Sequence, residues 1–313
     1  MKRSVASKCI KLLLFVACLA LLVWMVMVAG PEKLWQTLAS MPWTIAGCVA
    51  IWGIGYLLNA ESFRLILHAT CDKVGVDRKQ LSWWKVLKLT ISGYAINYIT
   101  PFGLLGGEPY RVIALRPLFG TEKATRSVVQ YSMMHIGSHF CLWLLSIAWA
   151  LMFLRDELSE YWTALLITFF ILLILLSLIG YYYRHDMFVK SLLLELLSRL
   201  ANVWEYWLIM RALGFDQFGY SDALMVVAFS SLLMNILFFS PMQLGTREGG
   251  IMLALQLLVP SVVVNVGTGA PLLAVAVALS FATRLRELIW IAIGLAMMRM
   301  KGTSDNEKIE ITI

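Results

Sequence analysis

The sequence predicts an all-α, polytopic membrane protein, and three observations carry this prediction. Hydrophobic residues make up 60% of the 313 residues and charged residues only 14%, too few to cover the surface of a soluble domain of this size. Apolar runs recur along the whole chain, which leaves no stretch for a separate soluble core. Several runs reach the length of roughly 20 residues that a helix needs to cross a bilayer.

Six apolar runs are predicted to cross the membrane fully, and two others to enter and leave it on the same side. The full spans are 10–29, 43–68, 127–154, 161–183, 187–213 and 271–299, and the re-entrant hairpins are 84–116 and 222–260. Pro, Gly and charged residues interrupt both hairpins near the middle. Such a break is tolerated at membrane depth only where protein or a wet cavity satisfies the backbone.

The first run, 10–29, follows basic residues as a signal peptide would, but it is long enough to span and more spans follow. It is therefore interpreted as a retained first helix.

The distribution of basic residues predicts how the chain is oriented. Lysines and arginines concentrate in the N-terminal ten residues, in loop 69–88, around 184–190 and at 299–301. By the positive-inside rule these segments lie in the cytoplasm, which places both termini on the inner side of the cell (inner) membrane. The net charge of +7 is thereby explained by topology, and no nucleic-acid partner is expected.

The remaining composition argues against several other classes of protein. The five cysteines are scattered without a CxxC pair, so neither a disulfide framework nor a zinc site is indicated. The sequence contains no nucleotide-binding loop and no Ser-His-Asp order. We therefore expect no cofactor, no metal and no enzymatic activity.

The tips of the two hairpins resemble each other and predict an internal repeat. Around Pro101 and Pro241, each tip has Thr or Ser before the proline, Leu three residues after it and Glu seven residues after it. The halves 1–155 and 156–301 then each contain span, span, hairpin and span, followed by a polar tail at 302–313. Three full spans per half require the second half to be inverted, as in many secondary transporters. The alternative is two unrelated kinked helices.

Charged and amide side chains at the tips and in the last span are the principal candidates for function, because ionic groups inside a membrane are costly. The substrate-binding candidates are Asn97, Glu108, Arg111, Asn235, Arg247, Glu248, Arg284, Arg286 and Glu287. A helix is predicted to start at Pro109, with Gly106 and Gly107 before it, and a similar one after Gly249. Two helix N-termini with arginines suit an anion such as phosphate. The alternative is that Glu108–Arg111 and Arg284–Glu287 are structural ion pairs.

Four further residues are secondary candidates: Arg64, Arg199, His135 and His139. Arg64 shares a helix face with Glu61 and could meet a lipid headgroup or reach towards water. Arg199 belongs to a charged stripe, with Glu195, Glu205 and Arg211, that lines a cavity or pairs with itself. The two histidines are four residues apart, but no carboxylate nearby in the sequence completes a metal site, so no metal is expected.

These residues resemble a known family. The similarity lies in Asn97-x-x-x-Pro101 with the following Glu-x-x-Arg111, in Pro241-x-x-x-Gly245-x-x-Glu248-Gly-Gly, and in the charged last span. Through these motifs the chain is similar to the lysylphosphatidylglycerol synthase transmembrane family over roughly residues 10–300. The resemblance implies a flippase-like membrane domain that moves lipids between leaflets. The aminoacyl-transferase domain of the longer members is not expected in this chain, and the tip Phe102-Gly-Leu-Leu-Gly-Gly differs from the family's shorter, more basic turn.

The function expected is therefore the movement of an anionic phospholipid or lipid-linked intermediate between leaflets. The alternatives are a small-solute or ion-coupled transporter, and an accessory or enzymatic subunit of lipid-linked glycan synthesis. An anionic membrane lipid is the expected partner. The protein partners considered are a second copy of the chain, which would form a homodimer, and a separate lipid-modifying enzyme.

Overall fold

The computed structural model describes residues 27, 31–99, 106–154, 159–184, 187–236, 246–266 and 270–299, and it confirms the all-α membrane fold. Within these ranges the regular structure is helical and no strand occurs. The predicted span 10–29, the tips at Pro101 and Pro241 and the tail 302–313 lie outside the described residues, apart from Met27. The re-entrant hairpins and the inverted repeat therefore stay predictions.

The helices follow one another along the whole described chain. They are α2 (Pro31–Ala39), α3 (Pro42–Val74), α4 (Trp83–Ile99), α5 (Gly107–Phe153), α6 (Trp162–Tyr183), α7 (Phe188–Ala212), α8 (Tyr220–Ile236), α9 (Thr246–Leu258), α10 (Pro260–Val266) and α11 (Ala270–Arg299), with short 3-10 turns at η1 (Arg78–Gln80) and η3 (Ser159–Tyr161). The predicted spans 43–68, 161–183, 187–213 and 271–299 fall on α3, α6, α7 and α11. Helices α2 and α10 lie in segments that the sequence predicts as connections.

Three helical stretches of the described part are long and apolar enough to cross a membrane: Pro42–Val74, Gly107–Phe153 and Ser159–Tyr183. Helix α6 has 22 residues, which corresponds to about 33 Å at 1.5 Å per residue. Most of its large apolar side chains are exposed, Phe170 and Ile174 among them. In a membrane, lipid chains would cover such a surface.

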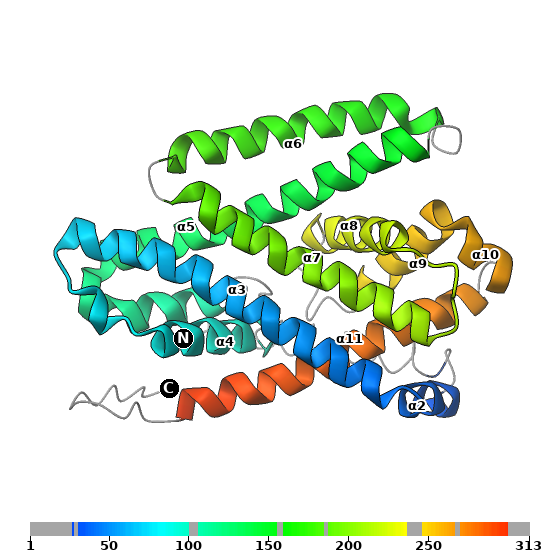
Figure 1. Ribbon diagram of the computed structural model, residues 1–313, viewed down its shortest axis with the longest axis horizontal. Helices are drawn as coiled ribbons and strands as arrows, with labels where there is room; N and C mark the ends of the chain where they lie inside the picture. The colour runs from blue at the N-terminus through cyan, green and yellow to red at the C-terminus, as the bar shows by residue number, and fades with distance from the viewer. Residues whose placement is uncertain are drawn as a thin grey trace, which may run out of the picture.

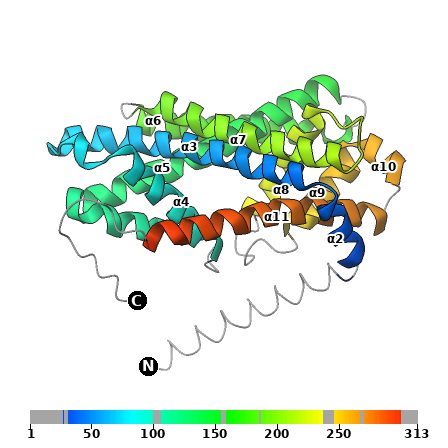
Figure 2. The ribbon, with the colours of Figure 1, turned by 60° about the horizontal axis from the view of Figure 1, so that its bottom comes forward.

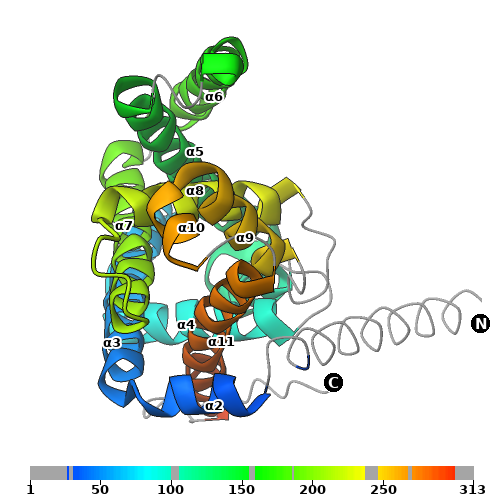
Figure 3. The same cartoon turned by 90° about the vertical axis from the view of Figure 1, so that its right-hand side faces the viewer.

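The helices are arranged around a central bundle, with α6 set to one side (Figures 1 and 3). Helix α3 packs along α7 in antiparallel fashion, since Gly47 lies beside Leu208, Gly55 beside Ser198, and Ser62 Oγ lies 2.7 Å from Ser191 Oγ. Helix α11 packs against α4 and α9, and α8 against α9. The view in Figure 2 shows α11 running below α3 and α7.

Helix α5 departs from the sequence prediction, which separates a hairpin arm ending at 116 from a span starting at 127. The structure has one helix, Gly107–Phe153, interrupted at Gly120, where φ is 72° and ψ is 166°. This backbone conformation is open to glycine and strained for other residues. A break of one residue thus replaces the predicted connection.

The helix starts after the tips also differ from prediction. Helix α5 begins at Gly107 instead of Pro109, and α9 begins at Thr246 instead of after Gly249. The close backbone approach expected at Gly107 is present, because a Cβ built on this residue would lie 2.1 Å from the carbonyl oxygen of Gly93. Small residues at helix interfaces permit such approach in membrane proteins.

Candidate functional site

A cavity lies between helices that come from both halves of the chain. Its volume is about 140 Å³, and its wall is formed by residues of α3, α4, α5, α7, α8, α9 and α11. The charged side chains on this wall are Arg199, Arg247, Arg286 and Glu287, and His135 and His139 join them. Amides, hydroxyls and aromatic rings make up most of the remainder, so charged and polar groups are set in a wall whose surface is otherwise largely apolar.

Arg286 of α11 is bound on two sides. Its Nε and Nη2 donate to the two carboxylate oxygens of Glu205 at 2.8 and 3.0 Å, and its guanidinium lies over the ring of Trp52 at 3.7 Å from the centroid. Both charged side chains are almost fully buried. This bidentate pair joins α7 to α11, and the stacking on Trp52 adds α3 to the contact.

Arg247 is the charged residue that α9 contributes to the cavity. Its Nη1 lies 2.8 Å from Glu287 Oε1 and donates to Thr283 Oγ1 at 3.4 Å, so that the first turn of α9 is tied to the middle of α11. Glu287 also lies 3.8 Å from Nη1 of Arg286. The two arginines therefore share one carboxylate on the cavity wall.

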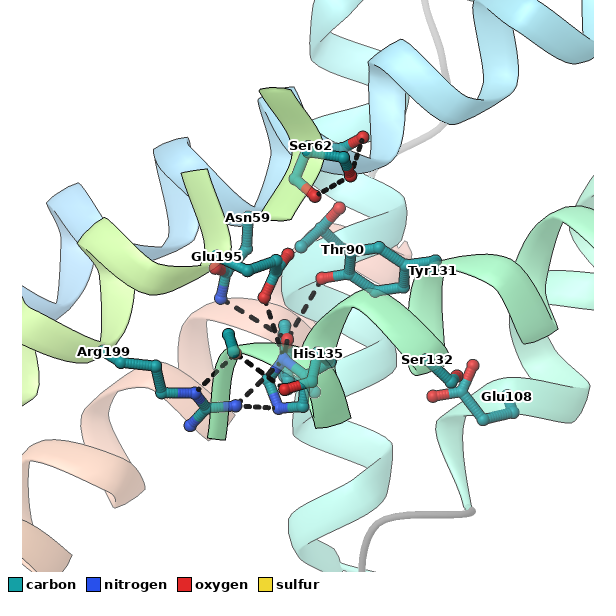
Figure 4. Close-up of polar contacts among 12 residues, drawn as sticks. Asn59, Ser62, Thr90, Glu108, Tyr131, Ser132, His135, Glu195 and Arg199 are labelled. Atoms are coloured by element: carbon teal, nitrogen blue, oxygen red, sulfur yellow. Dashed lines mark hydrogen bonds and ion pairs between the residues drawn. The ribbon is translucent and has the colours of Figure 1, made fainter. Parts of the chain in front are cut away.

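His135 of α5, also on the cavity wall, lies in a hydrogen-bonded cluster that is drawn in Figure 4. Glu195 Oε2 is 2.9 Å from His135 Nδ1, and Nη2 of Arg199 contacts both ring nitrogens, Nδ1 at 3.0 Å and Nε2 more closely. The two α7 residues are one helical turn apart and approach the imidazole together. The hydroxyl of Tyr94 lies 3.2 Å from Nδ1 and 3.0 Å from the hydroxyl of Tyr131.

This cluster corrects the sequence-based view that no carboxylate accompanies the two histidines. Glu195 is fully buried and reaches His135 from another helix, 60 positions away in the chain. His139 continues the row, with its ring centroid 5.6 Å from that of His135. Even so, no group of three or more His, Cys, Asp or Glu side chains among the described residues is arranged to hold a metal ion.

Four of the candidates form ion pairs away from the cavity wall. Arg111 Nη1 is 2.7 Å from Glu108 Oε1, as expected for that pair, and in Figure 4 Glu108 lies apart from the His135 cluster. Glu248 accepts from Arg284 at 2.9 Å and from Ser280 at 2.5 Å. The three-residue spacing in the sequence suggests an Arg284–Glu287 pair, whereas both residues form ion pairs with α9, through Glu248 and Arg247 respectively.

The structure thus divides the candidates into two groups. Asn97, Asn235, Arg247, Arg286 and Glu287 line the cavity, with Arg199, His135 and His139. Glu108, Arg111, Glu248 and Arg284 form ion pairs outside its wall. Arg64 is bound to Glu61 by two hydrogen bonds of 2.8 and 2.6 Å on α3, also away from the cavity.

Several wall residues were not singled out from the sequence. Trp52, Asn59, Tyr94 and Asn202 come from α3, α4 and α7. Asn59 lies two residues before Glu61, and Asn202 lies between Arg199 and Glu205, so their places beside charged residues inside long helices were a usable signal. Trp52 and Tyr94 carried none, because aromatic residues are frequent throughout this chain.

Fold and site together define the class: a multi-pass helical membrane protein with a buried, charge-lined cavity between its helices. The chain belongs to the lysylphosphatidylglycerol synthase transmembrane family, since the family model described as "Lysylphosphatidylglycerol synthase TM region" matches residues 9–268. This confirms the resemblance noted from the sequence and fits a role connected with membrane lipids. No curated protein and no solved structure matches the chain significantly.

Proposed function

We propose that this protein moves an anionic lipid between the leaflets of its membrane, with the headgroup in the cavity and the acyl or prenyl chains in the bilayer. The observation that carries the proposal is the cavity wall, on which Arg199, Arg247 and Arg286 face Glu287 inside an apolar helical protein. Arginine binds phosphate through planar, paired hydrogen bonds. Charged groups at such depth are retained for function more often than for stability.

Unsatisfied polar atoms beside the cavity support a polar occupant. Among the described residues, Asn59 Oδ1, Asn202 Oδ1 and Arg286 Nη1 are buried and have no hydrogen-bond partner. Buried polar atoms are normally paired, with protein, water or a ligand. A phosphate oxygen would accept from Arg286, and hydroxyls of a headgroup would donate to the two amides.

The size of the cavity favours a headgroup over a whole lipid. Its volume is about 140 Å³, and one ordered water takes roughly 10–15 Å³ on this scale. The space therefore accommodates about as much as a cluster of some ten waters, enough for a phosphorylated headgroup and too little for two acyl chains.

The proposal is tested with purified protein in vesicles that contain a fluorescent anionic phospholipid. The assay measures how fast this lipid becomes accessible to a membrane-impermeant quencher. Arg199→Gln should slow this rate at least tenfold, since Arg199 lines the cavity without a bidentate carboxylate partner. The matched control is Arg64→Gln, whose arginine pairs with Glu61 outside the cavity. Equal rates in wild type and Arg199→Gln would refute the mechanism.

A small-solute transporter is the second candidate, and the modest volume of the cavity favours it. The two functions differ in the chemistry of the occupant. A water-soluble phosphorylated compound that enters vesicles through the protein, while the fluorescent lipid stays in its leaflet, would support the solute and exclude the lipid.

A further inference from the structure

The charges around the cavity are balanced before any substrate enters. In the described part of the chain, four arginines lie on the cavity wall or in the neighbouring ion pair between α9 and α11: Arg199, Arg247, Arg284 and Arg286. The glutamates bound to them or to His135 are Glu195, Glu205, Glu248 and Glu287. Four positive charges therefore stand against four negative ones. An anionic headgroup would add an uncompensated charge, which is expensive in a buried site.

His135 is the neutral residue through which this imbalance can be removed. When Glu195 is ionised it can only accept a hydrogen bond, and the proton of a neutral His135 then lies on Nδ1, which donates across 2.9 Å. Nε2 is then an acceptor, and it accepts from Nη2 of Arg199. One more proton on Nε2 would end that hydrogen bond, because both groups would then be donors of like charge.

We infer that the His135–Glu195 pair is a proton-binding site and that an anionic substrate enters the cavity together with one proton. This inference rests on the proposed function and names the proton as the ion whose binding is coupled to binding of the anionic substrate. When the anion draws Arg199 away from His135, Nε2 takes up a proton, and Nδ1–H stays bound to Glu195. When the anion leaves, Nε2 loses the proton and again accepts from Arg199.

Arg199 links anion binding to protonation of His135, because it lines the cavity and also contacts the imidazole. The arginine can bind the anion or neutral His135, and protonation decides between them. Linkage then requires reciprocity: the anion strengthens proton binding by the same factor as the proton strengthens anion binding.

The other groups around His135 are compatible with this role. Tyr94 of α4 contacts Nδ1, and Tyr131 and His139 lie on the same helix as His135. Helix α3 presents the uncharged residues Asn59 and Ser62. Arg111 lies over the rings of Tyr94 and Tyr131 and is paired with Glu108, and the remaining cavity charges are those of Arg247, Arg286 and Glu287.

Proton uptake on binding tests the inference without requiring transport. Dioctanoyl-phosphatidylglycerol is added to the purified full-length protein in weakly buffered detergent, and a pH indicator records the protons taken up. Up to about one proton per bound lipid is expected, and the affinity should rise up to about tenfold for each unit by which the pH is lowered. Dioctanoyl-phosphatidylcholine, which is zwitterionic, should cause no uptake.

Variants locate the proton. His135→Gln should abolish the uptake and flatten the pH dependence of affinity, whereas His68→Gln, on α3 and outside the cavity wall, should leave both as in wild type. Glu195→Gln should reduce the uptake, because it removes the charge that stabilises the imidazolium. Size-exclusion profiles and melting temperatures show whether each variant is folded, and the wild-type measurement decides the question even if a variant is not.

The outcomes separate the two proposals. Lipid binding without proton uptake, or uptake that persists in folded His135→Gln, overturns the proton site and leaves lipid movement standing. Uptake caused by inorganic sulfate alone, an anion that does not itself titrate near neutral pH, supports the proton site with a soluble anion and counts against the lipid. Absence of binding by any anion overturns both.

Discussion

At the scale of single residues, the pair Arg286–Glu205 shows how this protein holds charge inside a membrane. The two side chains are 2% and 0% exposed, and two hydrogen bonds join them. Removing one partner leaves the other charged and almost fully buried, without its ion pair. Replacing both leaves an apolar contact, and such replacements are often neutral or stabilising.

We therefore predict opposite results for the single and double variants. Glu205→Gln should destabilise the protein by about 3–5 kcal/mol, which is expected to lower the melting temperature in detergent by several degrees. The double variant Glu205→Met with Arg286→Met, which leaves an apolar contact, should recover most of that loss. Glu61→Gln, in the partly exposed pair with Arg64, should change stability by less than about 1 kcal/mol. A single variant as stable as wild type would contradict the buried pairing.

At the scale of helices, the contact between α4 and α5 depends on the absence of side chains. A Cβ at Gly107 would lie 2.1 Å from the carbonyl oxygen of Gly93, and one at Gly93 would lie 2.5 Å from Arg111 Nε. The amide of Gly107 also donates to Asn97 Oδ1 at 2.5 Å. The first turn of α5 thus fixes Asn97, which lines the cavity, at the end of α4.

Gly107→Ala should accordingly separate the two helices. We predict a lower melting temperature and a reduced lipid-translocation rate, because backbone atoms cannot yield as a flexible side chain would. Gly249→Ala is the matched control: this glycine also lies near the start of a helix that follows a tip, and a Cβ there meets nothing within 4 Å. Comparable damage from both substitutions would show that the close α4–α5 contact is not the cause.

At the scale of the whole molecule, the sequence predicts helices better than it predicts their contacts. Long apolar runs bounded by polar residues determine the ends of α6, α7 and α11 to within a residue or two. The pairing of Glu205 with Arg286 spans 81 positions and depends on how two helices are rotated about their axes. Periodicity indicates that such residues are buried but does not indicate which partner they contact. The way in which these residues combine into a cavity wall could therefore not be predicted from the sequence.

The antiparallel packing of α3 and α7 also bears on orientation in the membrane. Leu81 after α3 and Tyr183 before α7 belong to one buried apolar cluster, so the basic connections near Lys79 and Arg184 lie at the same end of the bundle. Gln36 and Asp216 flank the opposite ends of α3 and α7. By the positive-inside rule, we expect the first pair in the cytoplasm and the second outside.

Cysteine labelling tests this orientation in a variant whose five native cysteines are replaced by alanine. We predict that Lys79→Cys and Arg184→Cys react with a membrane-impermeant maleimide only in inside-out vesicles, because both lie in exposed connections at the basic end. Gln36→Cys and Asp216→Cys should react only in right-side-out vesicles. If Lys79→Cys and Arg184→Cys reacted from opposite sides, α3 and α7 could not both cross the membrane as the packed antiparallel pair. If all four positions exchanged sides, the packing would stand and the assignment of the cytoplasmic face would be reversed.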